Sequence, residues 1–241
     1  MRCTKAFVLL MLFPSIVWAD GVLTPAANPP ETSLFNYRSG IELQDEFGTG
    51  NVTSGLIGQL GWFQAGGSYT QRDSEANRLG IGRLDTSAAS GTVSYLLFSG
   101  NQRFYNANDT FSWTWIIRPN NFDANTTLRI GQSLTCTVSP ITTGIYFERL
   151  DADTNWFAVT NEASSSTRTD TGIAPSAVFR TFSIEKTSNT SVKFYIDGVL
   201  KATHTTNIPT TQNSPCIHIV NSAAASKTMD LDYWQTKVTG L

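Results

Sequence analysis

Short runs of extended-chain character recur along this sequence from about residue 34 onward, and they constrain its fold more than any other feature. They come roughly every 8–15 residues and are separated by clusters of Gly, Asn, Asp and Ser, a pattern typical of strands joined by turns. In one run apolar and polar residues alternate, which places Phe111, Trp113, Trp115 and Ile117 on one face. No window of about a dozen residues keeps a helical period. The sequence therefore predicts an all-β fold, a single antiparallel β-sandwich.

Two hairpins can be placed from the turn residues. Residues 192–196 alternate in the same way, and Asp197-Gly198 separates them from a second strand pattern at residues 199–203. An Asp-Gly pair between two strand patterns is a strong hairpin signal, because both central residues of a type I′ turn need positive φ. A second hairpin is expected where residues 144–150 and 155–161 flank a short polar segment.

The first residues have the composition of a targeting signal. Arg2 and Lys5 precede an apolar run at residues 6–13, and residues 17–19 supply a small-x-small cleavage pattern. The apolar run is too short to span a bilayer comfortably, so residues 1–19 are predicted to be a cleaved secretory signal peptide. An uncleaved N-terminal anchor is the alternative.

The remainder divides into a lead-in and one domain. Residues 20–33 are rich in Pro and small residues and are predicted to be flexible, and residues 34–241 form the expected jelly-roll domain. No later segment approaches the ~20 apolar residues of a membrane helix. We therefore expect a secreted protein, extracellular or periplasmic, with no membrane span in the mature chain.

Composition excludes some classes of function. Only 15% of the residues are charged and the formal net charge is −2, which argues against a nucleic-acid binder with a basic surface. With 40% apolar and 11% aromatic residues, the chain can form a substantial core. Two cysteines follow the signal, Cys136 and Cys216. In an oxidising compartment they are a candidate disulfide, and two free buried thiols are the alternative.

Several strand and turn signatures resemble the concanavalin A-like lectin/glucanase superfamily, and more narrowly the LamG-like jelly rolls of phage structural proteins and secreted bacterial proteins. The resemblance covers roughly residues 40–240, and it implies two curved antiparallel sheets, one of them concave, whose first and last strands are neighbours. It specifies fold far better than function. The runs that carry it are residues 45–47, 55–62, 144–148, 155–160, 169–174, 194–200, 203–209 and 227–233.

The acidic motif of the glucanases is not reproduced. Members that cleave glucans resemble one another in a strand reading Glu-x-Asp-x-x-Glu, which supplies nucleophile and acid on one face. The nearest match is Asp230-Leu-Asp-Tyr-Trp-Gln235, in which the last acid is replaced by an amide that cannot transfer a proton. Because it lies near the C-terminus, we expect it in a closing edge strand, and we predict a non-enzyme.

Other catalytic arrangements have little support. His204 and His218 are the only histidines, and no zinc-binding spacing accompanies them. A polysaccharide lyase would need Tyr195 or Tyr146 beside a histidine, which leaves a polysaccharide-degrading enzyme as the third-ranked function.

Residues that alternate with the expected core suggest a sugar-binding platform. If residues 192, 194 and 196 face the core, the residues between them, Lys193 and Tyr195, face outward. The same alternation in the segment 155–161 is expected to place Phe157 and Val159 inward and Trp156 outward. An aromatic ring can stack on the apolar side of a pyranose while charged groups bind its hydroxyls. The predicted ligand-binding residues are Tyr146, Glu148, Trp156, Lys193 and Tyr195. The other large indoles are predicted to pack in the core, namely Trp62, Trp113, Trp115 and Trp234.

A structural Ca²⁺ is a further expectation, although no cofactor is required. The resemblance implies a calcium site where the first and last strands meet, and Asp45, Glu46 and Asp232 are acidic residues at matching ends of the chain. Calcium prefers six to eight oxygen ligands. Solvated carboxylates that protect edge strands are the alternative.

Two functions from different classes remain. The first is a secreted, non-catalytic carbohydrate-binding or adhesion module whose partner is a glycan or cell-surface polysaccharide. The second is a structural component of a virion or surface assembly, such as a tail, fibre or capsid decoration. A homo-oligomer is compatible with both. The signal peptide favours the first function, and the phage-like strand and turn signatures favour the second.

Overall fold

The computed structural model describes residues 41–47, 50–51, 56–78, 80–98, 109–136, 140–211 and 213–239. The predicted signal peptide and lead-in lie outside the described residues. Contacts divide the chain into Met1–Ser33 and Leu34–Leu241, and all of the described residues belong to the second unit. The described residues contain no α-helix, so none of them belongs to a helix that could cross a membrane.

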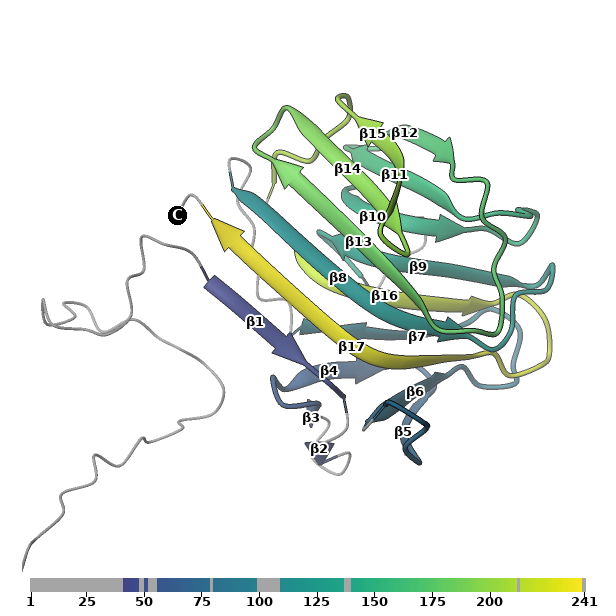
Figure 1. Cartoon of the computed structure of the whole chain (residues 1–241). Coiled ribbons are helices and arrows are strands. Elements are labelled where there is room, and N and C mark those ends of the chain that lie inside the picture. Colours follow the sequence, from purple (N-terminus) through teal and green to yellow (C-terminus); the bar gives the residue numbers. More distant parts are fainter. Residues whose placement is uncertain are drawn as a thin grey trace, which may run out of the picture. The chain divides into compact units, whose positions relative to one another are not determined.

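Two antiparallel sheets make up the described part of this unit (Figure 1). The eight-stranded sheet, here sheet A, has the order β15-β14-β13-β8-β17-β6-β5, with β1 also paired to β17. Its strands are β1 (Ile41–Asp45), β5 (Ser68–Arg72), β6 (Ile81–Asp85), β8 (Thr110–Pro119), β13 (Arg180–Thr187), β14 (Ser191–Ile196), β15 (Val199–His204) and β17 (Thr228–Thr239).

The nine-stranded sheet, here sheet B, has the order β12-β11-β10-β9-β16-β7-β4-β3-β2. Its strands are β2 (Gly50–Asn51), β3 (Leu56–Ile57), β4 (Trp62–Ala65), β7 (Thr92–Leu97), β9 (Thr126–Ser133), β10 (Gly144–Arg149), β11 (Phe157–Glu162), β12 (Ser165–Asp170) and β16 (Ser214–Asn221). The predicted all-β sandwich is confirmed.

The local signals explain the hairpins. Asp197 and Gly198 have φ values of 51° and 75°, so the turn between β14 and β15 takes the left-handed conformation that its sequence favours. The second expected hairpin is β10–β11, in which Phe147 pairs with Ala158.

The core lies between the sheets and is rich in aromatic rings. The alternating residues of β8 that were predicted to share a face are all buried, as are the four tryptophans predicted to pack. Trp62 from sheet B meets Trp234 from sheet A edge-on, with ring centres 4.9 Å apart. Such edge-to-face contacts stabilise a core beyond the area that they bury.

The first and last described strands are neighbours, as the resemblance implied: Ile41–Asp45 pairs with Trp234–Val238. The expectation that residues 230–235 form an edge strand is wrong. In β17 they pair with β8 along one side, while β6 and β1 take successive parts of the other side. β17 is thus interior to sheet A, where Figure 1 shows it beside β8 and β1.

Candidate ligand-binding site

A cavity of about 330 Å³ lies on the outer face of sheet A, the face directed away from sheet B. Tyr233 of β17 pairs with Ile116 of β8 at its base. The connection between β5 and β6 supplies one wall, and Glu46 follows directly after β1. We call this cavity the β17 pocket; its lining residues are Glu46, Asn77, Arg78, Gly80, Ile116, Asp232 and Tyr233.

A local irregularity brings Asp232 into this pocket. The register of β17 against β8 shifts between Leu231 and Tyr233, so the intervening Asp232 is an extra residue, as in a β-bulge. Bulges redirect side chains, and here Asp232 and the adjacent Tyr233 both line the cavity.

Ion pairs fix the wall of the pocket to the sheet. Arg78 is paired with Asp232, and Arg118 of β8 donates to both carboxylate oxygens of Glu75 at 2.7 and 3.0 Å. The Arg78 and Arg118 guanidinium groups also lie 4.0 and 4.4 Å from the centre of the Phe179 ring. Cation–π contacts of this kind help to hold both arginines in place.

The carboxylates in and beside the pocket have different environments. Asp230 is fully buried and accepts hydrogen bonds from Arg83 and Arg118, which outweigh the effect of burial and lower its pKa. Burial raises the pKa of Asp232; Arg78 opposes this rise, and the nearby Glu46 and Glu75 add to it. Asp232 is therefore the carboxyl group of this pair that gains a proton first.

The predicted calcium ligands are only partly brought together. Glu46 and Asp232 line the same pocket, but Asp45 does not. Its buried carboxylate accepts from the backbone N–H groups of Phe47 and Leu60, both at 2.8 Å, and from the Trp62 indole at 3.1 Å. A carboxylate occupied by N–H donors is not available to a cation, so the assignment of Asp45 as a ligand is corrected. No group of three or more metal-binding side chains occurs within the described ranges.

The five residues of the predicted sugar platform do not form one surface. Lys193 is exposed and Tyr195 half-buried on the outer face of sheet A, where the Tyr195 hydroxyl donates to Glu185 at 2.8 Å. Tyr146 and Glu148 belong to the outer face of sheet B and are both buried. The sandwich thus lies between the two pairs.

The predicted parity of β11 is wrong, and with it the outward position of Trp156. Trp156 is fully buried in the core, with its ring centre 4.9 Å from that of Phe182. Because Tyr146 pairs with Val159 and Glu148 pairs with Phe157, these four side chains share the outer face of sheet B. Phe157 and Val159 therefore point outward rather than into the core.

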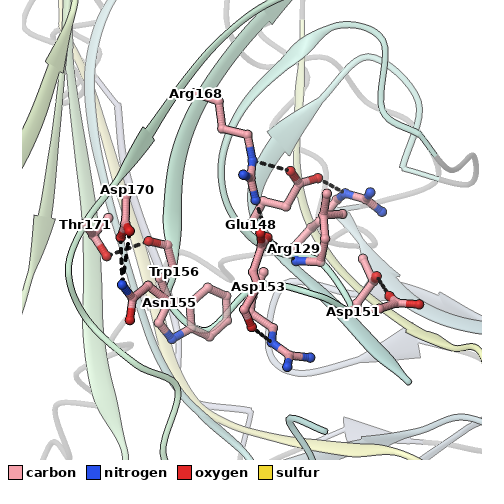
Figure 2. A network of polar contacts seen from close by, with 12 residues as sticks. Arg129, Glu148, Asp151, Asp153, Asn155, Trp156, Arg168, Asp170 and Thr171 are labelled. Carbon is pink, nitrogen blue, oxygen red and sulfur yellow. Dashed lines mark hydrogen bonds and ion pairs between the residues drawn. The ribbon is translucent and has the colours of Figure 1, made fainter. Parts of the chain in front are cut away.

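That outer face carries a second group of charged residues, shown in Figure 2. Arg129 of β9 donates from Nε to Glu148 of β10 at 2.7 Å, and Arg168 of β12 donates to the other Glu148 oxygen at 3.2 Å. Arg168 also pairs with Asp153, and Arg129 approaches Nδ1 of His218 at 3.4 Å. We call these residues the sheet B ionic cluster.

A disulfide-tethered segment covers part of this face. Cys136 is bonded to Cys216 of β16, which confirms the predicted disulfide. Ile141 packs on Tyr146 and Val159, and its carbonyl accepts from Asn161 at 2.7 Å. We call residues 134–136 and 140–143 the strap. Burial beneath such cover explains how apolar side chains are retained on an outer face.

Within the part of the chain that the structure describes, neither histidine hydrogen-bonds to a tyrosine, as a lyase would need. His204 hydrogen-bonds Thr160 at 3.0 Å and Thr169 at 2.9 Å, and burial lowers its pKa to about 4. Burial, together with Arg129, lowers the pKa of His218 to about 3. Both imidazoles are neutral at physiological pH and serve as hydrogen-bonding groups of the fold.

Sequence reasoning missed most of the β17 pocket. Asn77 and Arg78 lie in an irregular connection, whose position against β17 has no local signal. Tyr233 could have been found, because it follows Asp232 in the motif already singled out. Its role as a lining residue depends on the register shift, which alternation alone does not reveal.

The two-sheet architecture and the pairing of the first and last described strands define the class: in its fold the chain is a concanavalin A-like jelly roll, as the resemblance implied. Within that class, residues 76–232 match the model of the SO2946-like C-terminal domain, and the chain belongs to that family. A search of curated proteins finds no significant match.

Solved structures agree on the fold. The chain is similar to SO2946 from Shewanella oneidensis MR-1, described as a protein of unknown function, with 13% identity, a TM-score of 0.63 and coverage of 83% of this chain and 87% of that one. It is also similar to a Bacillus licheniformis β-glucanase, with 18% identity, a TM-score of 0.57 and coverage of 83% of this chain and 98% of that one. A third similar structure is the carbohydrate recognition domain of Emp47p, with 11% identity, a TM-score of 0.56 and coverage of 84% of this chain and 98% of that one. At these identities the likeness establishes the fold alone.

Proposed function

We propose that the protein is a secreted, non-catalytic carbohydrate-binding module that holds a glycan in the β17 pocket. The observation that carries the proposal is the composition of this cavity. An aromatic residue, Tyr233, lines a space of about 330 Å³ together with the polar residues Asn77, Glu46 and Asp232. Sugar-binding sites combine an aromatic surface for the ring carbons with acceptors and donors for the hydroxyls.

Two further observations support this role. The similar structures include a carbohydrate recognition domain as well as a β-glucanase, so this fold holds sugars in other proteins. The Cys136–Cys216 bond is typical of proteins exposed to an oxidising compartment, which agrees with secretion.

A glycoside hydrolase is the second candidate, because Glu46 and Asp232 line one pocket and the pKa of Asp232 is raised by burial. Glycosidases use two carboxyl groups, one of them an acid with a raised pKa. The ion pair with Arg78 favours the binding role, since it engages the carboxyl group that would have to protonate the leaving group.

Binding should be measured by calorimetry against a panel of oligosaccharides. We expect Tyr233→Ala to weaken binding at least about tenfold, which corresponds to the loss of one ring contact. Tyr195→Ala is the matched control, since Tyr195 lies on the same outer face but does not line the pocket. Equal melting temperatures of the two variants would exclude a folding defect.

The same oligosaccharides should be tested for release of reducing ends. No release is expected. Cleavage that disappears in Glu46→Gln and Asp232→Asn would replace the binding role with a hydrolase. A folded protein that ignores every glycan and forms stable homo-oligomers would favour the surface-assembly role instead.

A further inference from the structure

The β17 pocket and the ion pairs beside it have more negative charge than the arginines of this region neutralise. Arg78 is paired with Asp232, while Arg83 and Arg118 both bond to Asp230. Arg118 also bonds to Glu75. Each of the three guanidinium groups is therefore committed to at least one carboxylate.

Glu46 differs from these carboxylates. It lines the cavity, its side chain is exposed, and it forms no hydrogen bond or ion pair with any residue in the described ranges. Four carboxylates thus face three guanidinium groups, and the unmatched one is at the cavity itself. A ligand with negative charge would meet repulsion here, whereas a cation would be attracted.

Hydrogen-bonding capacity leads to the same ligand. The carboxylate of Glu46 offers acceptors only, and the second Asp232 oxygen and the Asn77 carbonyl can accept as well. An ammonium group is a compact donor with three N–H bonds and no acceptor, and it also interacts favourably with the face of an aromatic ring such as Tyr233. A neutral hydroxyl would leave the Glu46 charge without a counterion.

We propose that the glycan recognised in the β17 pocket is built of amino sugars with free amines, and that a sugar ammonium group binds between Glu46 and Asp232. This inference rests on the proposed function. It identifies the ligand as a cationic saccharide of the glucosamine type, in preference to neutral glucans, N-acetylated chains or uronates.

Calorimetry with four oligosaccharides of equal length tests this assignment. The probes are glucosamine oligomers, N-acetylglucosamine oligomers, neutral β-1,4-glucose oligomers and galacturonate oligomers, at a pH where the amine is protonated. We expect the free-amine oligomer to bind at least about tenfold more tightly than its acetylated or neutral counterparts. This preference should weaken as the salt concentration rises.

Glu46→Gln should remove the preference, while Glu185→Gln, which deletes an acid of the same face outside the pocket, should retain it. Equal or tighter binding of neutral or acidic chains, or a preference that survives in Glu46→Gln, would overturn the assignment. If neutral chains bind and are lost in Tyr233→Ala, the carbohydrate-binding role stands and only the amino-sugar assignment fails. If no oligosaccharide binds, both are refuted.

Discussion

The outer faces of the two sheets carry similar residues in different surroundings. On sheet B the side chains of Arg129 and Glu148 are 4% and 8% exposed, and His218 is fully buried. On sheet A the side chains of Arg78 and Asp232 are 26% and 13% exposed and border a cavity. Both outer faces thus hold arginine–carboxylate pairs, and these two pairs differ in their exposure to solvent.

The degree of burial decides whether such an ion pair contributes to stability or remains available to a ligand. An ion pair removed from water leaves a large penalty if one partner is lost, whereas a pair in contact with solvent adds little to stability and remains available to a ligand. We therefore assign the sheet B ionic cluster to the integrity of the fold and the β17 pocket to recognition.

The largest effect is expected from the disulfide that tethers the strap to sheet B. Its cysteines are 80 residues apart, so replacing both with alanine should lower the free energy of unfolding by about 4 kcal/mol, because the unfolded chain regains the freedom of a long loop. Urea unfolding of the double variant and the parent would measure it. A difference below about 1 kcal/mol would show that the strap contributes little to this face.

Disruption of the sheet B ionic cluster should cause the next largest loss of stability. Glu148→Gln leaves the buried Arg129 without its counterion and should lower stability by about 3 kcal/mol in the same experiment. Glu75→Gln, which removes the exposed partner of Arg118 on sheet A, is the matched control and should have no measurable effect. Similar losses in both variants would contradict the contrast between the faces.

Acid should destabilise the protein through His218. Its pKa is about 3 in the fold because of burial and Arg129, so below an ordinary value near 6.5 only the unfolded state gains the proton. Stability therefore falls as the pH drops from about 6.5 toward 3, by about 1.4 kcal/mol per pH unit for this group. Unfolding measured across this range should show a shallower slope in His218→Gln, and an unchanged slope would mean that the imidazole is protonated in the fold.

Much of the fold could be predicted because its signals are local. The alternation in residues 111–117 and the Asp197-Gly198 turn act over a few residues, and both agree with the structure. The four tryptophans predicted to pack in the core are all buried, since burial of large rings is a strong general tendency; they are Trp62, Trp113, Trp115 and Trp234.

The surfaces could not be predicted to the same degree, because they depend on distant segments. At the start of β11 the run Trp156-Phe-Ala-Val159 is apolar at every position, so alternation does not reveal which side is inward. The strap supplies cover for Val159 through Ile141, which is remote from the local pattern. The β17 pocket likewise forms only where β1, β8, β17 and the β5–β6 connection meet. Of its lining residues, only Glu46 and Asp232 were predicted from the sequence to lie near each other, as calcium ligands.

The smallest effect concerns charge within the β17 pocket. Because Glu46 contributes to the raised pKa of Asp232, Glu46→Gln should lower the pKa of Asp232, and a carbon-detected NMR titration of that carboxyl group would measure the change. Stability should change by no more than about 0.5 kcal/mol, as expected for an exposed side chain. Glu185→Gln should leave the pKa of Asp232 unaltered. An unchanged pKa in Glu46→Gln would mean that solvent screens the two carboxylates from each other, and the pocket would then lack the concentrated charge that distinguishes it from the compensated cluster on sheet B.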